Sequence, residues 1–387
     1  MQPFSFATTA QLLCESGSAL RLADLSRERG GSRVLIVTDP GITHLGMLDD
    51  ILPGFVAANV SVAVFDQVRA DPPEAVVMQA VELARALGAE LVVGFGGGSS
   101  MDVAKLVAVL AHPDCSQALA DLYGVGNAKG KRLPLIQVPT TAGTGSEVTP
   151  IAIVTTSGTT KLGVVSPLLL PDLAVLDADL TLGLPPAVTA ATGIDAMVHA
   201  IEAYTSKLKK NPLSDLLARE ALRLLAANLD EAVRNGGNRA ARQAMLLGAC
   251  LAGQAFANAP VSAVHALAYP LGGRFHIPHG LSNALVLPHV LGFNAEVAAP
   301  LYAELAPLVL GRRLRPGNAA CLAEQLIVAL AEFSERSGLP TRLRDAGVPA
   351  HSLAQLAHDA MQQQRLLVNN PREVSEHQAL SIYQAAY

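Results

Sequence analysis

The sequence predicts an α/β domain with a mostly parallel sheet, followed by an all-helical domain. In the first half of the chain, short apolar runs alternate with stretches of helical spacing, which is the pattern of βαβ units. After Pro185 and Pro186, alanine, leucine, glutamate and arginine dominate and only helical spacing remains. We therefore place the boundary near residue 184, which gives an α/β domain over 1–184 and a helical domain over 185–387.

The elements of the first domain follow from short apolar runs. The predicted strands are 33–38, 60–65, 90–95, 133–138 and 151–155, and the stretches 73–87 and 100–111 have helical spacing. In the second domain, glycine and proline separate the helical stretches. The predicted helices there are 187–206, 212–233, 239–257, 281–299, 318–337 and 351–364.

Composition excludes several classes of protein. Half of the 387 residues are hydrophobic and 16% are charged, which favours a packed globular enzyme over a disordered chain. The net charge is −5 and no basic stripe is present, so we expect no nucleic-acid partner. We also expect no membrane span, because every long apolar stretch contains charged or turn residues. The four cysteines are far apart and no signal-peptide pattern is visible, which predicts a reduced, cytoplasmic protein.

A glycine-rich segment directly follows the predicted strand 90–95. Three consecutive glycines, Gly96, Gly97 and Gly98, precede Ser99 and a predicted helix. Glycine lets the backbone approach an anion closely, and the start of a helix supplies unpaired N–H groups and a positive dipole end. These features suit a dinucleotide pyrophosphate. The segment lacks the GxGxxG spacing, so the alternative is an ordinary turn with Ser99 or Ser100 as a helix cap.

Two further features suit a dinucleotide. The segment 139–149 follows a predicted strand and is rich in glycines and hydroxyls, including Thr140, Thr141 and Thr149. Its donors could bind a cofactor, although ordinary turn chemistry is the alternative. Asp39 ends the first predicted strand, where a carboxylate can accept from the adenine ribose and repel a 2′-phosphate. This favours NAD over NADP, with capping of a turn as the alternative.

Residues of metal-binding types lie in three segments of the second domain. Asp195 and His199 are four apart in a predicted helix and therefore share one face. His265 and His279 lie in separate segments. One carboxylate and three imidazoles suit Fe²⁺, Zn²⁺ or another divalent transition metal. Each histidine taken alone could equally be a buried structural residue. His276 could lie on the substrate side of the same site.

Together these motifs resemble the iron-containing (group III) alcohol dehydrogenase family over essentially the whole chain. The resemblance rests on the segments 96–105 (GGGSSMDVAK), 139–147 (PTTAGTGSE), 193–204 (GIDAMVHAIEAY) and 279–284 (HGLSNA). It implies a dehydroquinate-synthase-like fold, with a dinucleotide domain before a helical metal domain. It also implies a homodimer.

The resemblance implies roles for individual residues. The metal ligands would be Asp195, His199, His265 and His279, holding Fe²⁺ or alternatively Zn²⁺. NAD would be bound by Asp39, Gly97, Gly98, Ser99, Asp102, Thr140, Thr141, Thr149 and Lys161.

The sequence departs from the family pattern at Tyr269. Many members carry a second histidine here, four residues after His265, and it is often proposed to move protons or contact the nicotinamide. We therefore expect Tyr269 or His276 to assist proton transfer. A tyrosine here is similar to the hydroxyacid–oxoacid transhydrogenase branch. A second departure is Asp71-Pro72, where Asn-Pro is common.

The expected activity is reversible hydride transfer between a small alcohol and NAD, with an aldehyde or ketone as the other product. The metal would lower the pKa of the substrate hydroxyl, and the nicotinamide would accept the hydride. Two alternatives remain open. One is a transhydrogenase that passes hydride from a hydroxyacid to an oxoacid on tightly held NAD. The other is a non-catalytic NAD-binding protein that keeps the scaffold.

Overall fold

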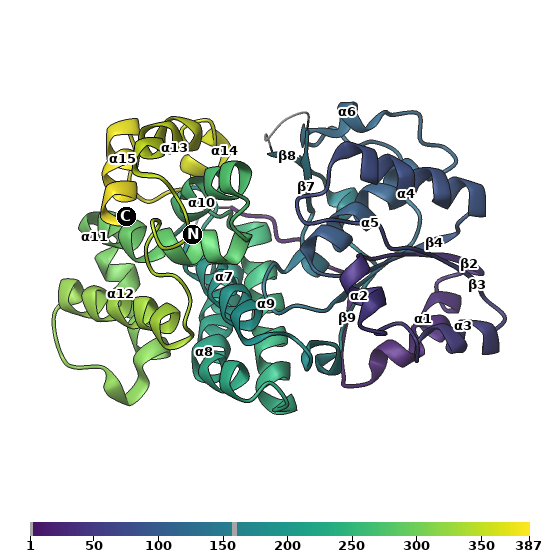
Figure 1. Ribbon diagram of the computed structural model, residues 1–387, viewed down its shortest axis with the longest axis horizontal. Coiled ribbons are helices and arrows are strands. Elements are labelled where there is room, and N and C mark those ends of the chain that lie inside the picture. The colour runs from purple at the N-terminus through teal and green to yellow at the C-terminus, as the bar shows by residue number, and fades with distance from the viewer. Residues whose placement is uncertain (1–2, 157–160) are drawn as a thin grey trace. The chain divides into compact units, whose positions relative to one another are not determined.

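The computed structural model describes residues 3–156 and 161–387, which form two compact units (Figure 1). The N-terminal unit contains residues 7–141 and 145–182 among those described. The C-terminal unit contains residues 183–387 and the short segments 3–6 and 142–144. The sheets belong to the N-terminal unit and the long helices α7 to α12 to the C-terminal unit, in agreement with the predicted fold class.

A six-stranded parallel sheet forms the centre of the N-terminal unit, in the order β1-β9-β6-β4-β2-β3. Its strands are β1 (Gln11–Cys14), β2 (Arg33–Val37), β3 (Ser61–Phe65), β4 (Leu91–Gly96), β6 (Leu135–Pro139) and β9 (Leu173–Leu176). The predicted strands 33–38, 60–65, 90–95 and 133–138 correspond to β2, β3, β4 and β6. β1 and β9 were not predicted. The short edge strand β1 is partly exposed and lacks a continuous apolar run, whereas β9 is fully buried but only four residues long.

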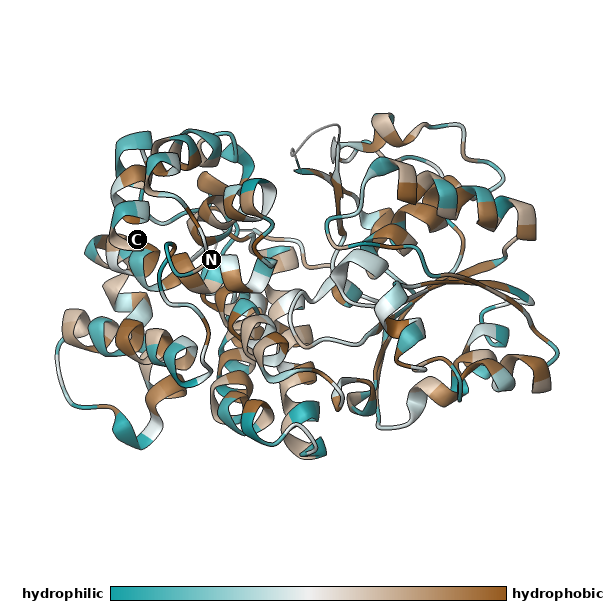
Figure 2. Cartoon of the chain, viewed as in Figure 1, coloured by the Kyte–Doolittle hydropathy of each residue, from teal (hydrophilic) through white to brown (hydrophobic). Residues whose placement is uncertain are grey.

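Alternate residues of the central strands pack on opposite faces of this sheet. Leu35, Val37 and Val92 belong to the core under α4 (Glu74–Leu87) and α5 (Gly98–Leu110). Val34, Ile36 and Val93 belong to the core that includes α1 (Leu22–Arg27), α2 (Pro40–His44) and α3 (Leu52–Ala57). Helices on both faces leave the central strands fully buried, which explains their unbroken apolar runs (Figure 2).

The predicted strand 151–155 lies outside the parallel sheet. As β7 (Ile151–Thr155) it pairs antiparallel with β8 (Lys161–Val165) in a three-stranded sheet that β5 (Gly124–Val125) completes. The side chains of β7 alternate between buried and half-buried, as in a strand with one face on the core. The short helix α6 (Leu119–Leu122) precedes β5.

The C-terminal unit is built from helices. They are α7 (Pro186–Thr205), α8 (Pro212–Arg234), α9 (Arg239–Asn258), α10 (Ala263–Phe275), α11 (His279–Leu310), α12 (Ala319–Arg336), α13 (Leu353–Ala360), α14 (Gln364–Leu367) and α15 (Glu376–Ala385). The predicted helices 187–206, 212–233, 239–257 and 318–337 agree closely with α7, α8, α9 and α12.

Proline explains two differences from the predicted helices. The predicted helix 281–299 is α11, which continues through Pro300 and Pro307. Both prolines are exposed, so water can satisfy the carbonyls that they leave unpaired. α10, which carries His265, was not predicted, because Pro270 and two glycines interrupt its helical pattern. Its placement makes His265 a helix residue.

α11 is long and apolar enough to cross a membrane by length and composition. It packs against α7, α8, α10 and α12 within the C-terminal unit. We therefore interpret it as the core helix of this unit.

Close packing of β4 on α5 makes Gly94 sensitive to substitution. A Cβ at Gly94 would lie 2.0 Å from Gln137 Oε1 and 2.8 Å from Ala104 Cβ. We expect Gly94→Ala to cost about 1–3 kcal/mol of unfolding free energy through overpacking. Thermal denaturation measures this as a lower melting temperature. Gly183→Ala is the control, because a Cβ there meets no atom within 4 Å. Equal melting temperatures for the two variants would contradict the packing.

Candidate functional site

Four side chains of the C-terminal unit converge on one point. Asp195 and His199 project from α7, His265 from α10, and His279 begins α11. Each offers one ligand atom, and these atoms lie within 4.8 Å of one another. Asp195, His199 and His265 are buried, whereas His279 is partly exposed. The structure thus brings together the four residues that the sequence suggested as ligands.

Helix spacing and one glycine create this convergence. Asp195 and His199 are one turn apart on α7 and point the same way. Gly280 lets α11 begin directly against α7: a Cβ there would lie 2.4 Å from the carbonyl oxygen of Ala191. His279 therefore reaches the side of Asp195, with its Nε2 3.6 Å from Asp195 Oδ1.

The cluster consists of groups that accept hydrogen bonds or bind cations. Nε2 of His265 lies 3.0 Å from Nε2 of His199 and 3.9 Å from Asp195 Oδ1. Burial lowers the pKa of His199 to about 4, so its imidazole is neutral near pH 7. Burial would raise the pKa of Asp195, but the three histidines and the Asn283 amide outweigh it and hold the pKa below its ordinary value. The cluster therefore combines a carboxylate with at least one neutral imidazole.

These side chains fit a divalent metal. Asn283 Nδ2 donates to Asp195 Oδ1 at 2.5 Å and lies 3.3 Å from Nε2 of both His265 and His279. One amide group has two protons to offer to three acceptor atoms, and His199 adds a fourth. A buried cation satisfies all four at once. One carboxylate and three imidazoles are the ligand types that Fe²⁺, Zn²⁺ and similar ions accept.

Tyr269 and Phe256 line the cluster. The Tyr269 ring centroid lies 5.9 Å from that of His279 and 6.4 Å from that of His265. Phe256 stacks on His199 with the ring centroids 4.4 Å apart. Tyr269 is therefore on the side of the partly exposed ligand, as required of a group that meets substrate.

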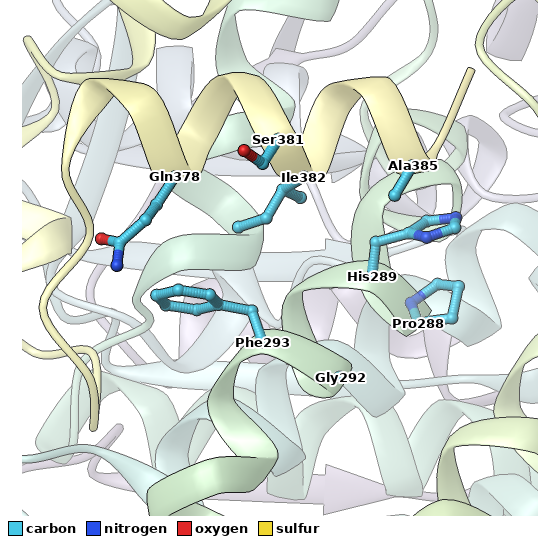
Figure 3. Close-up of a pocket in the computed structure, with 8 residues that line it drawn as sticks. All are labelled: Pro288, His289, Gly292, Phe293, Gln378, Ser381, Ile382 and Ala385. Carbon is cyan, nitrogen blue, oxygen red and sulfur yellow. The ribbon is translucent and has the colours of Figure 1, made fainter.

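Two other histidines have different surroundings. His276 is exposed and forms the left-handed end of α10, three residues before His279. In the part of the chain that the structure describes, no contact joins its ring to the cluster. His289 lines a pocket with Phe293 of α11 and with Gln378 and Ile382 of α15 (Figure 3).

In the N-terminal unit, six of the nine predicted cofactor residues lie at the carboxyl ends of neighbouring strands, and Asp102, Thr149 and Lys161 do not. Asp39 follows β2, the glycine segment follows β4, and Thr140 and Thr141 follow β6. These strands lie side by side in the order β6-β4-β2. Because β3 lies on one side of β2 and β4 on the other, the strand order reverses between β2 and β4. Ligands of open α/β sheets bind at such a point.

The glycine segment forms a close turn. Gly96 has a φ of 146°, and a Cβ there would lie 2.8 Å from Ser100 Oγ and 3.2 Å from Asp39 Oδ2. Gly97 is the N-cap of α5 and no side chain caps this helix, so capping by Ser99 or Ser100, the alternative that the sequence left open, is not observed. The first N–H groups of α5 have no partner within the helix, which suits an anion such as a pyrophosphate.

Asp39 has two sets of contacts. Its Oδ1 accepts from the N–H groups of Gly41 at 2.9 Å and Ile42 at 3.3 Å, and so caps α2. Its Oδ2 lies 3.4 Å from Ser100 Oγ, beside the glycine turn. The capping alternative is therefore observed, and the second oxygen still faces the end of β4.

A buried lysine connects α5 to the segment 139–149, the second segment that the sequence predicts to bind the cofactor. Lys105 Nζ donates to Ser146 Oγ at 2.8 Å, Thr149 Oγ1 at 3.0 Å and the carbonyl of Ile151 at 2.7 Å. Asp102 accepts from Ser146 Oγ at 2.6 Å and from the N–H of Ile153 at 2.9 Å. Lys105 and Ser146 thus connect Thr149 to Asp102 through hydrogen bonds. Lys161, also predicted to bind NAD, forms an ion pair with Asp71, with its Nζ 2.6 Å from Asp71 Oδ1.

Sequence reasoning missed three residues that hold these sites together. Glu202 is seven residues after Asp195 on α7, Asn283 is four after His279 on α11, and Lys105 is three after Asp102 on α5. Each lies at a helical spacing from a residue that was identified. Extending the helix faces by one or two turns would have found all three.

The close approach of α11 to α7 can be tested at Gly280. We expect Gly280→Ala to displace His279 and to weaken divalent-metal binding by about tenfold or more, the effect usual for groups that orient ligands. A chelator competition assay with Zn²⁺ measures this. Gly292→Ala is the control in the same helix, because a Cβ there meets no atom within 4 Å. Parent-like affinity in Gly280→Ala would contradict the role of this contact.

The buried Glu147 predicts a pH dependence of stability. Burial raises the pKa of Glu147 from 4.5 to about 7, and the charge of Lys105 works in the opposite direction. The folded protein then keeps a proton that the unfolded chain loses near pH 4.5. This stabilisation is complete below about pH 4.5 and is lost as pH rises through about 7.

Comparison with Glu147→Gln isolates this contribution, because the amide cannot ionise. We expect the melting temperature of the parent to fall relative to that of the variant as pH rises from 4.5 to 7. Differential scanning calorimetry across this range measures the difference. If the melting temperature of the parent minus that of Glu147→Gln stayed constant or rose over this pH range, Glu147 would be ionised in the folded protein.

Comparisons with known proteins agree with this geometry. The model of the family described as iron-containing alcohol dehydrogenase matches residues 9–178, and the C-terminal model of the same family matches residues 189–387. A long-chain-alcohol dehydrogenase of Geobacillus thermodenitrificans is 42% identical over 377 residues, which cover 96% of this chain and 93% of that protein.

Solved structures match the whole fold. The crystal structure of a 1,3-propanediol oxidoreductase superposes with a TM-score of 0.95 at 34% identity and covers 100% of both chains. The sulfoacetaldehyde reductase of Bifidobacterium kashiwanohense, solved with NAD⁺, gives a TM-score of 0.88 at 28% identity and covers 100% of this chain and 99% of the other. The family inferred from the four sequence motifs is confirmed, and this chain belongs to the iron-containing alcohol dehydrogenases.

Proposed function

We propose that this NAD-linked, iron-family alcohol dehydrogenase interconverts a small uncharged alcohol and its aldehyde or ketone at a metal held by Asp195, His199, His265 and His279. The observation that carries the proposal is the buried convergence of four acceptor groups within 4.8 Å. We propose Fe²⁺ as the metal, with Zn²⁺ as the alternative, because the ligand types suit both ions.

A divalent metal in this cluster would supply Lewis-acid polarisation of the substrate oxygen, and NAD would supply the hydride acceptor. Asn283 orients the Asp195 carboxylate, and Phe256 holds the plane of the His199 ring by stacking on it. His279 is the partly exposed ligand, so we expect the alcohol to approach on its side. The Tyr269 ring lies beside His279, and its hydroxyl could pass the alcohol proton to water, with exposed His276 as a second route.

For the cofactor we propose the residues at the carboxyl ends of β2, β4 and β6. The N–H groups of Gly98 and Ser99, at the start of α5, would bind the pyrophosphate, with Gly97 giving close access. Asp39 would accept from the adenine ribose, and Thr140, Thr141 and Thr149 would line the nicotinamide side. Asp102 and Lys161 would support these contacts. The domain over 1–184 would then hold NAD and the domain over 185–387 the metal.

The substrate class follows from the side chains around the cluster. Phe256, Tyr269 and Asn283 contact the proposed ligands and are all uncharged. The similar proteins act, by name, on long-chain alcohols, 1,3-propanediol and sulfoacetaldehyde. These three side chains offer no cation, so they favour an uncharged substrate such as a small alcohol or diol over a sulfonate, whose charge would need a cationic partner.

We further propose a cytoplasmic homodimer, in keeping with the family resemblance and with four well-separated cysteines. Light scattering coupled to size-exclusion chromatography tests the assembly. A monomer mass would reject the dimer.

Metal depletion tests the function. We expect protein stripped by a chelator to lose NAD⁺ reduction with short primary alcohols and diols, and to regain it when Fe²⁺ or Zn²⁺ is added anaerobically. Absorbance of NADH measures the rate. Asp195→Ala and His265→Ala should remain inactive after metal is added. Full activity in either variant, or in stripped protein, would contradict the proposal.

Tyr269 gives this assay a second use. Because a tyrosine at this position resembles the transhydrogenase branch, the assay includes hydroxyacid and oxoacid pairs without added NAD⁺. Exchange of hydride within such a pair, with no NADH released from any alcohol, would replace the dehydrogenase proposal by the transhydrogenase.

A further inference from the structure

Glu202 is a buried carboxylate on the same face of α7 as the two proposed ligands of that helix. It lies seven residues after Asp195 and three after His199, and it is 2% exposed. Its Oε2 lies 2.7 Å from Nδ1 of His265. Its Oε1 accepts from Ser262 Oγ at 2.9 Å and from the N–H of Val264 at 2.7 Å. Three donors therefore converge on one carboxylate at the start of α10.

This contact determines which ring nitrogen of His265 carries the proton. An ionised carboxylate can only accept, so Nδ1 of His265 must be the donor. In a neutral imidazole the lone pair is then on Nε2, the atom 3.0 Å from Nε2 of His199. The contact with Glu202 thus turns the lone pair of His265 toward the proposed metal.

Glu202 also completes the charge of the buried site. Asp195 is 1% exposed and Glu202 is 2% exposed. Asp195 accepts from Asn283 and Glu202 accepts from three donors, so a dication held between the ligands would balance two buried carboxylates. Buried charges without such compensation are strongly unfavourable.

We infer that Glu202 is a positioning residue that fixes the protonation and orientation of His265 and thereby raises the affinity of the site for a divalent metal. The inference rests on the proposed metal site. It assigns to Glu202 no contact with substrate or cofactor.

Glu202→Gln provides the main test, because glutamine keeps the size but cannot serve all three donors. If its oxygen accepts from His265, its NH₂ group faces the N–H of Val264. If it is turned round, the NH₂ group faces Nδ1 of His265 and favours the proton on Nε2. We expect the dissociation constant for Zn²⁺, measured by chelator competition on the full chain, to rise by about 10- to 100-fold.

Two further variants separate the explanations. Ser262→Ala removes one donor to Glu202 but leaves His265 in place, and we expect its affinity for Zn²⁺ to equal that of the parent. An equal loss in Ser262→Ala would overturn the inference, because the effect would then come from the start of α10. His265→Ala checks the site itself. Weak binding in His265→Ala with parent-like binding in Glu202→Gln would reject only the role of Glu202.

A measurement on the unsubstituted chain does not depend on how the variants fold. Nitrogen NMR of ¹⁵N-histidine-labelled, metal-free protein should find His265 protonated on Nδ1. Protonation on Nε2 alone would overturn the inference.

Discussion

Lone pairs that meet in a buried space repel one another unless a positive group lies between them. In the C-terminal unit, nitrogen atoms of three histidines and an oxygen of Asp195 lie within 4.8 Å of one another, and three of these residues are almost fully buried. The packing of the surrounding helices maintains this arrangement. Asp195, His199 and Glu202 occupy one face of α7, Gly280 brings α11 against that helix, and Glu202 holds the start of α10. The way α7, α10 and α11 pack together is thus the arrangement that holds four acceptor groups around one cation.

The cofactor site that we propose in the N-terminal unit has a different requirement, which is that backbone N–H groups at the carboxyl edge of the parallel sheet are available to an anion. The reversal of strand order between β2 and β4 opens this edge, and Gly96 allows the chain to turn sharply into α5. Buried Lys105 and partly buried Asp102 then connect α5 to the segment 139–149, which we propose to line the cofactor. Burying a lysine is costly, and its three hydrogen bonds offset this cost.

Much of this arrangement could be predicted from the sequence because it depends on local patterns. Buried parallel strands have unbroken apolar runs, and a turn of helix separates Asp195 from His199. The pairing of β7 depends on a partner strand that local patterns do not identify, so its antiparallel sheet was missed. α10 was missed because Pro270 interrupts the helical pattern of its sequence. Helical spacing from Asp195 points to the position of Glu202, but its role depends on contacts with residues 60 or more positions away, which spacing along the chain cannot show.

X-ray absorption spectroscopy of the metal-loaded protein tests most directly whether the four converging side chains form one metal site. Zinc-loaded protein, at one ion per chain, should show three imidazole nitrogens and a carboxylate oxygen around the metal, with metal–nitrogen distances of about 2.0–2.1 Å. Coordination by sulfur, or by oxygen atoms alone, would contradict this site, because the ion would then be bound elsewhere.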